Sequence, residues 1–126
     1  MKQDAKGKTL RSEDSTDDSL LNYFATSIKW TPLNAILESF SCLEQDLREL
    51  LGRSWGERRI SAMPLELIQE AQKLGKVDAA TVNSVKGLTS LRNLAIHAPE
   101  GAVTEERARE FVVMVDAVLF ALRGSY

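Results

Sequence analysis

The feature that most constrains the fold is a row of large apolar residues at helical spacing between Thr31 and Gly52. These residues recur every three or four positions, so a helix gathers them on one face. They are Leu33, Ile36, Leu37, Phe40, Leu43, Leu47, Leu50 and Leu51. Thr31 is a suitable N-cap, Pro32 suits the first helical position, and Gly52 is a stop signal. The sequence therefore predicts a helix over residues 32–51.

Three more segments, residues 62–74, 78–97 and 105–123, show the same apolar spacing between start and stop signals. The signals are Pro64, Gly75, Asp78, Pro99 and Thr104. The faces expected to be buried comprise Leu67, Ile68, Ala71 and Leu74, then Val82, Val85, Leu88, Leu91, Ala95 and Ile96, and finally Ala108, Phe111, Val115, Val118 and Leu122. There is no alternating strand pattern and no glycine-rich phosphate loop. Four helices joined by short loops predict an all-α fold, an antiparallel four-helix bundle.

The chain of 126 residues is expected to consist of a polar tail and one domain. Residues 1–18 are charged and polar, so they cannot bury enough apolar surface to fold, and we expect a disordered tail. Residues 19–30 are more apolar and could form an extra short helix within a single domain over residues 19–126.

Several features favour a cytoplasmic protein that does not insert into a membrane. The longest apolar run, residues 111–122, contains Asp116 and is shorter than the about 20 residues that a spanning helix needs. The N-terminus has no signal-peptide pattern. Cys42 is the only cysteine, so no disulfide can form within one chain, which fits a reducing compartment.

The charge balance provides no general attraction to nucleic acid. The formal net charge is −2, whereas nucleic-acid binders usually carry a basic surface, so any RNA or nucleotide contact must use a local patch. One candidate patch is the loop of residues 52–60, where Arg53, Trp55, Arg58 and Arg59 could guide an RNA strand by charge and stacking. Alternatively, this loop is simply solvated and Trp55 packs against the bundle.

Arg92 is the most unusual residue of the third predicted helix, because it falls in the middle of the apolar stripe. An arginine is rarely fully buried unless it is paired. Glu44 lies on the inner stripe of the first helix, so a buried Arg92–Glu44 pair could be purely structural. Alternatively, Arg92 acts with Asn93 and His97, which are four residues apart on a flanking face. Arg92 and His97 are separated by about 140° around the helix axis, so they do not stack directly.

The segment that contains these residues resembles the end of a HEPN domain (higher eukaryotes and prokaryotes nucleotide-binding). The similarity comprises Arg92, the polar Asn93, the four residues between Arg92 and His97, the small residue and proline that follow, and a capped final helix. The nearest resemblance is to small bacterial HEPN-like domains of unassigned function. It covers about residues 32–123, and its specific part is residues 88–112.

The resemblance implies a helical bundle and, in active members of the family, a metal-independent endoribonuclease whose site forms at a homodimer interface. Arg92 would grip a phosphate, His97 would exchange a proton with the ribose 2′-OH or the leaving oxygen, and Asn93 would orient His97 or the phosphate. Such a protein could act in a toxin or defence setting, with an antitoxin as partner. Two alternatives stay open: a non-catalytic interaction or dimerisation module, which could be the tail of a larger protein, and nucleotide binding without turnover.

Two further expectations concern metals and self-association. His97 is the only histidine and no cysteines or carboxylates cluster beside it, so we expect no metal site and no cofactor. Leu94, Val113 and Phe120 point away from the inner stripes of their helices, which makes them candidates for a homodimer interface. Alternatively, residues 19–30 cover these three side chains within one subunit.

Overall fold

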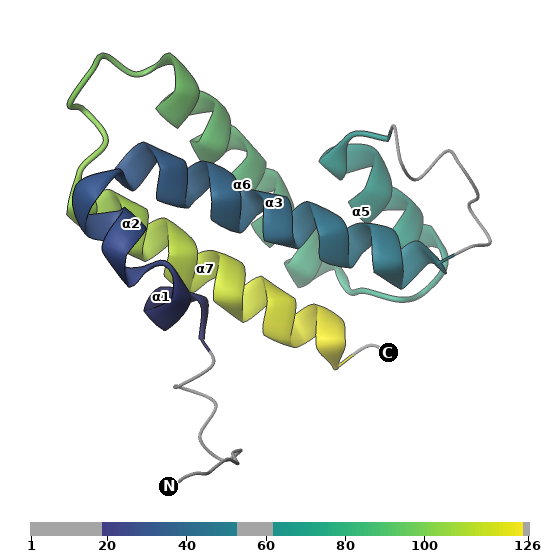
Figure 1. The fold of residues 1–126 in the computed structure, drawn as a ribbon. Helices are drawn as coiled ribbons and strands as arrows, with labels where there is room; N and C mark the ends of the chain where they lie inside the picture. Colours follow the sequence, from purple (N-terminus) through teal and green to yellow (C-terminus); the bar gives the residue numbers. More distant parts are fainter. Residues whose placement is uncertain (1–18, 53–61, 125–126) are drawn as a thin grey trace, which may run out of the picture.

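The structure, a computed structural model, describes residues 19–52 and 62–124 of the chain (Figure 1). Within these two ranges it consists of six α-helices and contains no strand. The helices are α1 (Leu20–Tyr23), α2 (Ala25–Trp30), α3 (Pro32–Leu51), α5 (Pro64–Lys73), α6 (Ala79–His97) and α7 (Glu105–Arg123). The all-α prediction is therefore confirmed, and each of the four long helices lies where the sequence predicts it. No helix in the described ranges combines the length and the apolar character that crossing a membrane requires.

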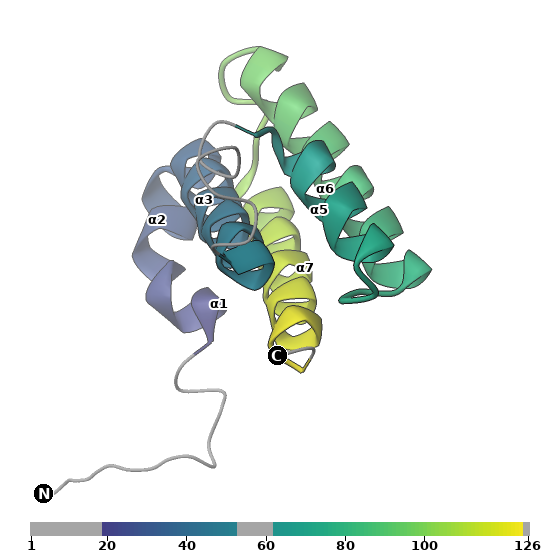
Figure 2. The ribbon, with the colours of Figure 1, turned by 90° about the vertical axis from the view of Figure 1, so that its right-hand side faces the viewer.

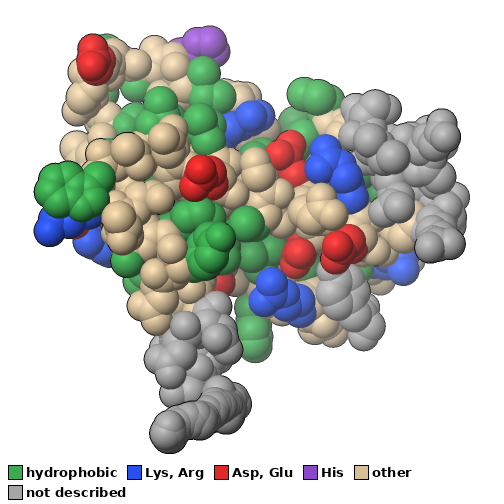
Figure 3. Space-filling model, in the orientation of Figure 1, with side chains coloured by type: hydrophobic (Ala, Val, Ile, Leu, Met, Phe, Trp, Pro, Cys, Tyr) green, Lys and Arg blue, Asp and Glu red, His purple; other side chains and the backbone are tan. Residues whose placement is uncertain are grey.

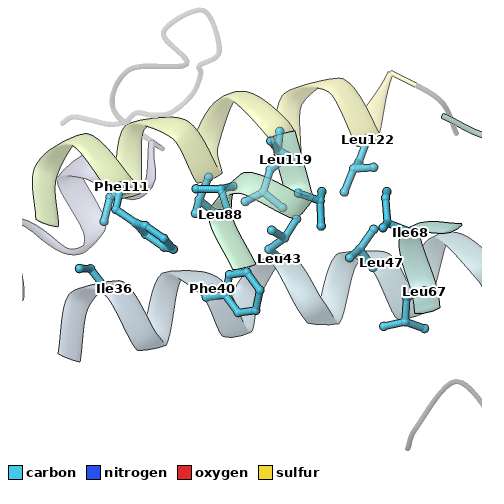
Figure 4. Close-up of a cluster of buried hydrophobic side chains, with 14 of the residues drawn as sticks. Ile36, Phe40, Leu43, Leu47, Leu67, Ile68, Leu88, Phe111, Leu119 and Leu122 are labelled. Carbon is cyan, nitrogen blue, oxygen red and sulfur yellow. The ribbon is translucent and has the colours of Figure 1, made fainter. Parts of the chain in front are cut away.

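Helices α3 and α7 form the centre of the molecule. In Figure 2, α1 and α2 lie on one side of this pair, and α5 and α6 lie on the other. Figure 4 shows side chains from α3, such as Phe40 and Leu43, pointing toward Leu119 and Leu122 of α7, with Leu88 of α6 between the helices. All five of these side chains are buried. One continuous apolar core therefore holds the long helices together.

The ends of the helices follow the predicted signals, with one exception. Asp78 Oδ1 accepts the N–H of Thr81 at 2.9 Å, and Thr104 Oγ1 accepts the N–H of Arg107 at 3.1 Å, so both residues act as N-caps. Gly52 ends α3 with a φ of 69°, a conformation that favours glycine. Thr31 does not cap α3, because its hydroxyl donates to the Ser27 carbonyl of the preceding helix instead, at 3.3 Å.

The segment at residues 19–30 forms two short helices rather than one. The chain turns at Phe24, which ends α1 and precedes α2. Phe24 and Ile28 are both buried, so this segment covers the side of α3 and α7 that faces away from α6. The tail predicted over residues 1–18 lies outside the described residues.

Three residues expected in the core are exposed: Leu74, Leu91 and Ile96. Leu74 is the C-cap of α5, where the chain already turns away from the bundle. Ile96 lies in the last turn of α6, which extends beyond the end of the shorter α5 (Figure 2). A helical-wheel prediction assumes that other helices pack along the full length of the helix. The last turn of α6 lies beyond the end of α5, so Ile96 is exposed there.

Candidate functional site at the end of helix α6

Arg92 lies over the ring of Phe40, where α6 packs against α3. Its Cζ atom is 4.8 Å from the ring centroid, and Phe40 is 1% exposed. Arg92 itself is half-buried. This geometry is a cation–π contact, which accounts for an arginine within an otherwise apolar stripe.

The guanidinium of Arg92 has no acidic partner among the described residues. Its Nε atom is buried and has no hydrogen-bond acceptor. The expected Arg92–Glu44 ion pair is not formed, because the guanidinium ends over Phe40 and does not reach the next turn of α3, where Glu44 is half-buried. Because Nε itself is sealed from solvent, an external anion could meet this guanidinium only through its terminal NH2 groups.

His97 and Asn93 are both exposed, and His97 is the last residue of α6. No hydrogen bond joins the two side chains in the part of the chain that the structure describes. The structure therefore does not bring Arg92, Asn93 and His97 together within one subunit: Arg92 faces α3, whereas the other two face solvent. The Arg92 guanidinium is partly buried and the His97 imidazole is exposed. The backbone positions of the two residues are about 7.5 Å apart along the helix axis.

The predicted RNA-binding residues Arg53, Trp55, Arg58 and Arg59 lie outside the described residues. On the face of the molecule shown in Figure 3, acidic and basic side chains are interspersed, and no extended basic area is visible. Any attraction to RNA on this face would therefore have to come from individual basic side chains.

The three candidate interface residues are exposed as the sequence predicts. Leu94 is 68%, Val113 is 48% and Phe120 is 81% exposed. The alternative, that residues 19–30 cover them, is wrong, because α1 and α2 pack elsewhere, through Phe24 and Ile28.

Sequence reasoning missed an apolar groove between α6 and α7. A cavity of about 340 Å³ opens beside Leu94, Ala98 and Arg107, and a second of about 370 Å³ opens beside Gly87 and Ala121. Leu91 and Met114 line both cavities, so the two form one groove. The available signal was the set of small residues Ala80, Ser84, Gly87, Ala117 and Ala121, which leaves space between the two helices in the second cavity.

Other reactive groups do not form a second site. Burial raises the pKa of the Cys42 thiol, and the nearby charges of Asp46 and Glu38 add to this effect, so the thiol stays protonated at neutral pH. The described residues contain no group of three or more His, Cys, Asp or Glu side chains that could hold a metal ion. No protein-family model, curated protein or solved structure matches the chain. The end of α6 must therefore be interpreted from its own residues.

Proposed function

We propose that this protein is a HEPN-like antiparallel four-helix bundle, built from α3, α5, α6 and α7, that binds RNA and cleaves it without a metal ion. The observation that carries the proposal is the half-buried guanidinium of Arg92, which has no acidic partner among the described residues and begins the R-x4-H pattern. The setting we propose is a toxin or defence system in the cytoplasm, with an antitoxin as a further partner.

In the proposed site, Arg92 binds the phosphate at which the chain is cut. A guanidinium holds its N–H donors in a fixed fork that matches two phosphoryl oxygens. Phe40 limits how the side chain can turn, because the ring lies directly against the guanidinium. A donor held in this way needs little reorganisation when negative charge builds up on the phosphoryl oxygens in the transition state.

His97 supplies the proton transfer in this proposal. The ribose 2′ oxygen forms a bond to phosphorus as it loses its proton to a base, and the bond from phosphorus to the 5′ oxygen breaks as that oxygen gains a proton. An imidazole can perform either transfer near neutral pH. With one histidine per chain, a mechanism that uses separate histidines as acid and base needs two copies of the protein.

A second candidate function is a non-catalytic interaction module. Two observations favour it: Arg92 and His97 face different directions within one subunit, and the α6–α7 side of the molecule exposes large apolar side chains. Under this alternative, the contact between Arg92 and Phe40 has a packing role only.

The test is cleavage of single-stranded RNA by purified protein in the presence of EDTA. We expect cleavage by the wild type, products that end in a 2′,3′-cyclic phosphate, and loss of cleavage in His97→Gln, because the glutamine amide can form hydrogen bonds but cannot exchange protons near neutral pH. Arg92→Met keeps the apolar stem over Phe40 and removes the phosphate donors, so cleavage and RNA binding should both be lost. Arg109→Met is the matched control, because Arg109 is exposed and, among the residues that the structure describes, pairs with Glu105 of its own helix.

The outcomes separate the candidates. RNA left intact by the wild type would overturn the ribonuclease proposal, and intact RNA together with a melted Arg92→Met variant would favour the interaction module. RNA that is bound through Arg92 but not cut would indicate binding without turnover. Equal loss of cleavage in Arg92→Met and Arg109→Met would show that general charge, not this site, is responsible.

A further inference from the structure

The groove between α6 and α7 continues onto an unusually apolar face of α7. From Phe111 to Leu122, the only charged side chain of α7 is Asp116, which is half-buried. Val113, Ala117 and Phe120 recur at helical spacing on the exposed side of α7, next to Met114 in the groove. The groove and this stripe together form one surface, which we call the α6–α7 surface.

The α6–α7 surface is large enough to matter in association. Its five large apolar side chains, Leu91, Leu94, Val113, Met114 and Phe120, are between 40% and 81% exposed. At roughly 150 Å² for each fully exposed side chain, the low end of the range for aromatic residues, they present on the order of 400 Å² of apolar surface. The largest apolar patch on a typical monomer is about 300–600 Å² and is often functional, and a stable interface buries about 800 Å² on each partner, so the polar ends of the groove must contribute the remaining area.

The shape of the surface is self-complementary. Phe120 projects as a large exposed side chain near the C-terminal end of α7, and the cavity at the opposite end of the groove is lined by the small residues Ala95, Ala98 and Ala102. A two-fold symmetric interface uses the same patch on both copies, so a projection on one copy must meet a recess on the other. The same surface carries both.

The charges at the two ends of the groove are also complementary. Arg107 and Glu110 line one end, and Asp78 and Lys76 lie at the other. None of these four side chains forms an ion pair within the described part of the chain. A two-fold axis perpendicular to the groove reverses its direction, so the end with Arg107 would face the end with Asp78 of the second copy.

We propose that the occupant of the α6–α7 surface is a second copy of this chain, bound about a two-fold axis near Leu91 and Met114. Phe120 of each copy fills the groove of the other, and Arg107 approaches Asp78 of the second copy. This interface does not depend on the proposed ribonuclease chemistry.

The test is sedimentation of the full chain over a range of protein concentrations. We expect a dimer for the wild type and a dissociation constant at least about 100-fold higher for Phe120→Glu and for Leu94→Glu, because a charge replaces an apolar contact at the centre of the interface. Trp30→Glu is the matched control: Trp30 is 71% exposed but lies on α2, so the same change should shift the constant less than about threefold. Circular dichroism verifies that each variant is folded.

A charge exchange tests the direction of the pairing. Arg107→Glu should weaken the dimer about tenfold, because it places a carboxylate near Asp78 of the second copy. Adding Asp78→Ser should restore most of this loss, since serine still caps α6 but carries no charge. A monomeric wild type, a dimer that survives both glutamate variants, or equal weakening by Trp30→Glu would overturn the proposal. A dimer that leaves RNA intact overturns the proposed function alone, whereas a monomer that cleaves RNA overturns only the interface.

Discussion

The two sides of helix α7 are similarly apolar but differ in burial. Toward α3, α7 buries Phe111, Val115 and Leu122, and Figure 4 shows such side chains meeting those of α3. On the α6–α7 surface, Val113 and Phe120 are exposed although they are just as apolar. Within one subunit, α3 covers the first side of α7. The other side is similarly apolar, but no helix in the described part of the subunit covers it.

This difference shows which part of the apolar sequence serves folding. Packing within one subunit explains the buried side of α7 completely, and removing atoms there should destabilise the chain. The exposed side contributes little to folding of the single chain, so we attribute its apolar character to association. The predictions below test this division, from the largest expected effect to the smallest.

The largest expected difference is between two neighbouring residues of α7. Leu119→Ala should lower the free energy of unfolding by about 3 kcal/mol, because Leu119 is fully buried and its loss leaves a cavity. Phe120→Ala should change it by less than about 0.5 kcal/mol, because the ring is exposed. Urea unfolding in dilute protein, where association contributes little, measures both values. A similar decrease in the free energy of unfolding in both variants would contradict the distinction between the buried and the exposed side of α7.

Adding volume should also distinguish the two sides. Ala108→Leu places a larger side chain in the sealed core and should destabilise the chain by about 2 kcal/mol. Ala117→Leu adds the same atoms to the open groove and should change the free energy of unfolding by less than about 0.5 kcal/mol. The same Ala117→Leu variant should weaken the dimer, because it fills space that the second copy would occupy. Equal destabilisation would show that the groove is already closed.

Gly87→Ala should stabilise the chain by up to about 1 kcal/mol. Gly87 lies within α6 with nothing within 4 Å of an added Cβ, and alanine is the better helix former. Gly101→Ala is the control, because Gly101 has a φ of 84° and a side chain there is strained. Thermal unfolding should show a higher midpoint for the first variant and a lower midpoint for the second. A lower midpoint for Gly87→Ala would mean that α6 and α7 are in closer contact there.

The smallest expected effect is in the pH dependence of stability. Burial raises the pKa of the Asp46 carboxyl on α3, although Arg123, at 3.6 Å, partly opposes this. Folding therefore disfavours the charged form, and the contribution of Asp46 to stability improves as the pH falls through its raised pKa. The pKa of Asp78, at the end of the groove, is lowered because its carboxylate accepts the N–H of Thr81. Its stabilising contribution is present above the ordinary aspartate pKa and is lost as the pH falls.

Urea unfolding between neutral and acidic pH measures these contributions when the wild type is compared with Asp46→Asn and Asp78→Asn. On acidification, the wild type should gain stability relative to Asp46→Asn, by less than about 1 kcal/mol. Relative to Asp78→Asn it should lose stability. Slopes of the same sign would contradict the assignment of these two environments.

The helices could be predicted from the sequence because their signals are local. The apolar spacing of residues 32–51 and the caps Asp78 and Thr104 act within one or two turns, and the structure confirms them. The exposure of Ile96 could not be predicted, because it depends on how far α5 extends beside α6. Helical spacing also could not decide whether Arg92 meets Glu44 or Phe40, since both lie on the inner stripe of α3, one turn apart.

The most direct test of the central claim is a disulfide cross-link at the proposed two-fold axis. A residue beside such an axis faces its own copy, so Met114→Cys in a Cys42→Ala background should form a disulfide-linked dimer on mild oxidation. Thr26→Cys, exposed on α2 on the other side of α3 and α7 from α6, should remain a monomer under the same conditions. If Met114→Cys stays monomeric, or Thr26→Cys cross-links equally fast, the apolar side of α7 is not covered by a second copy.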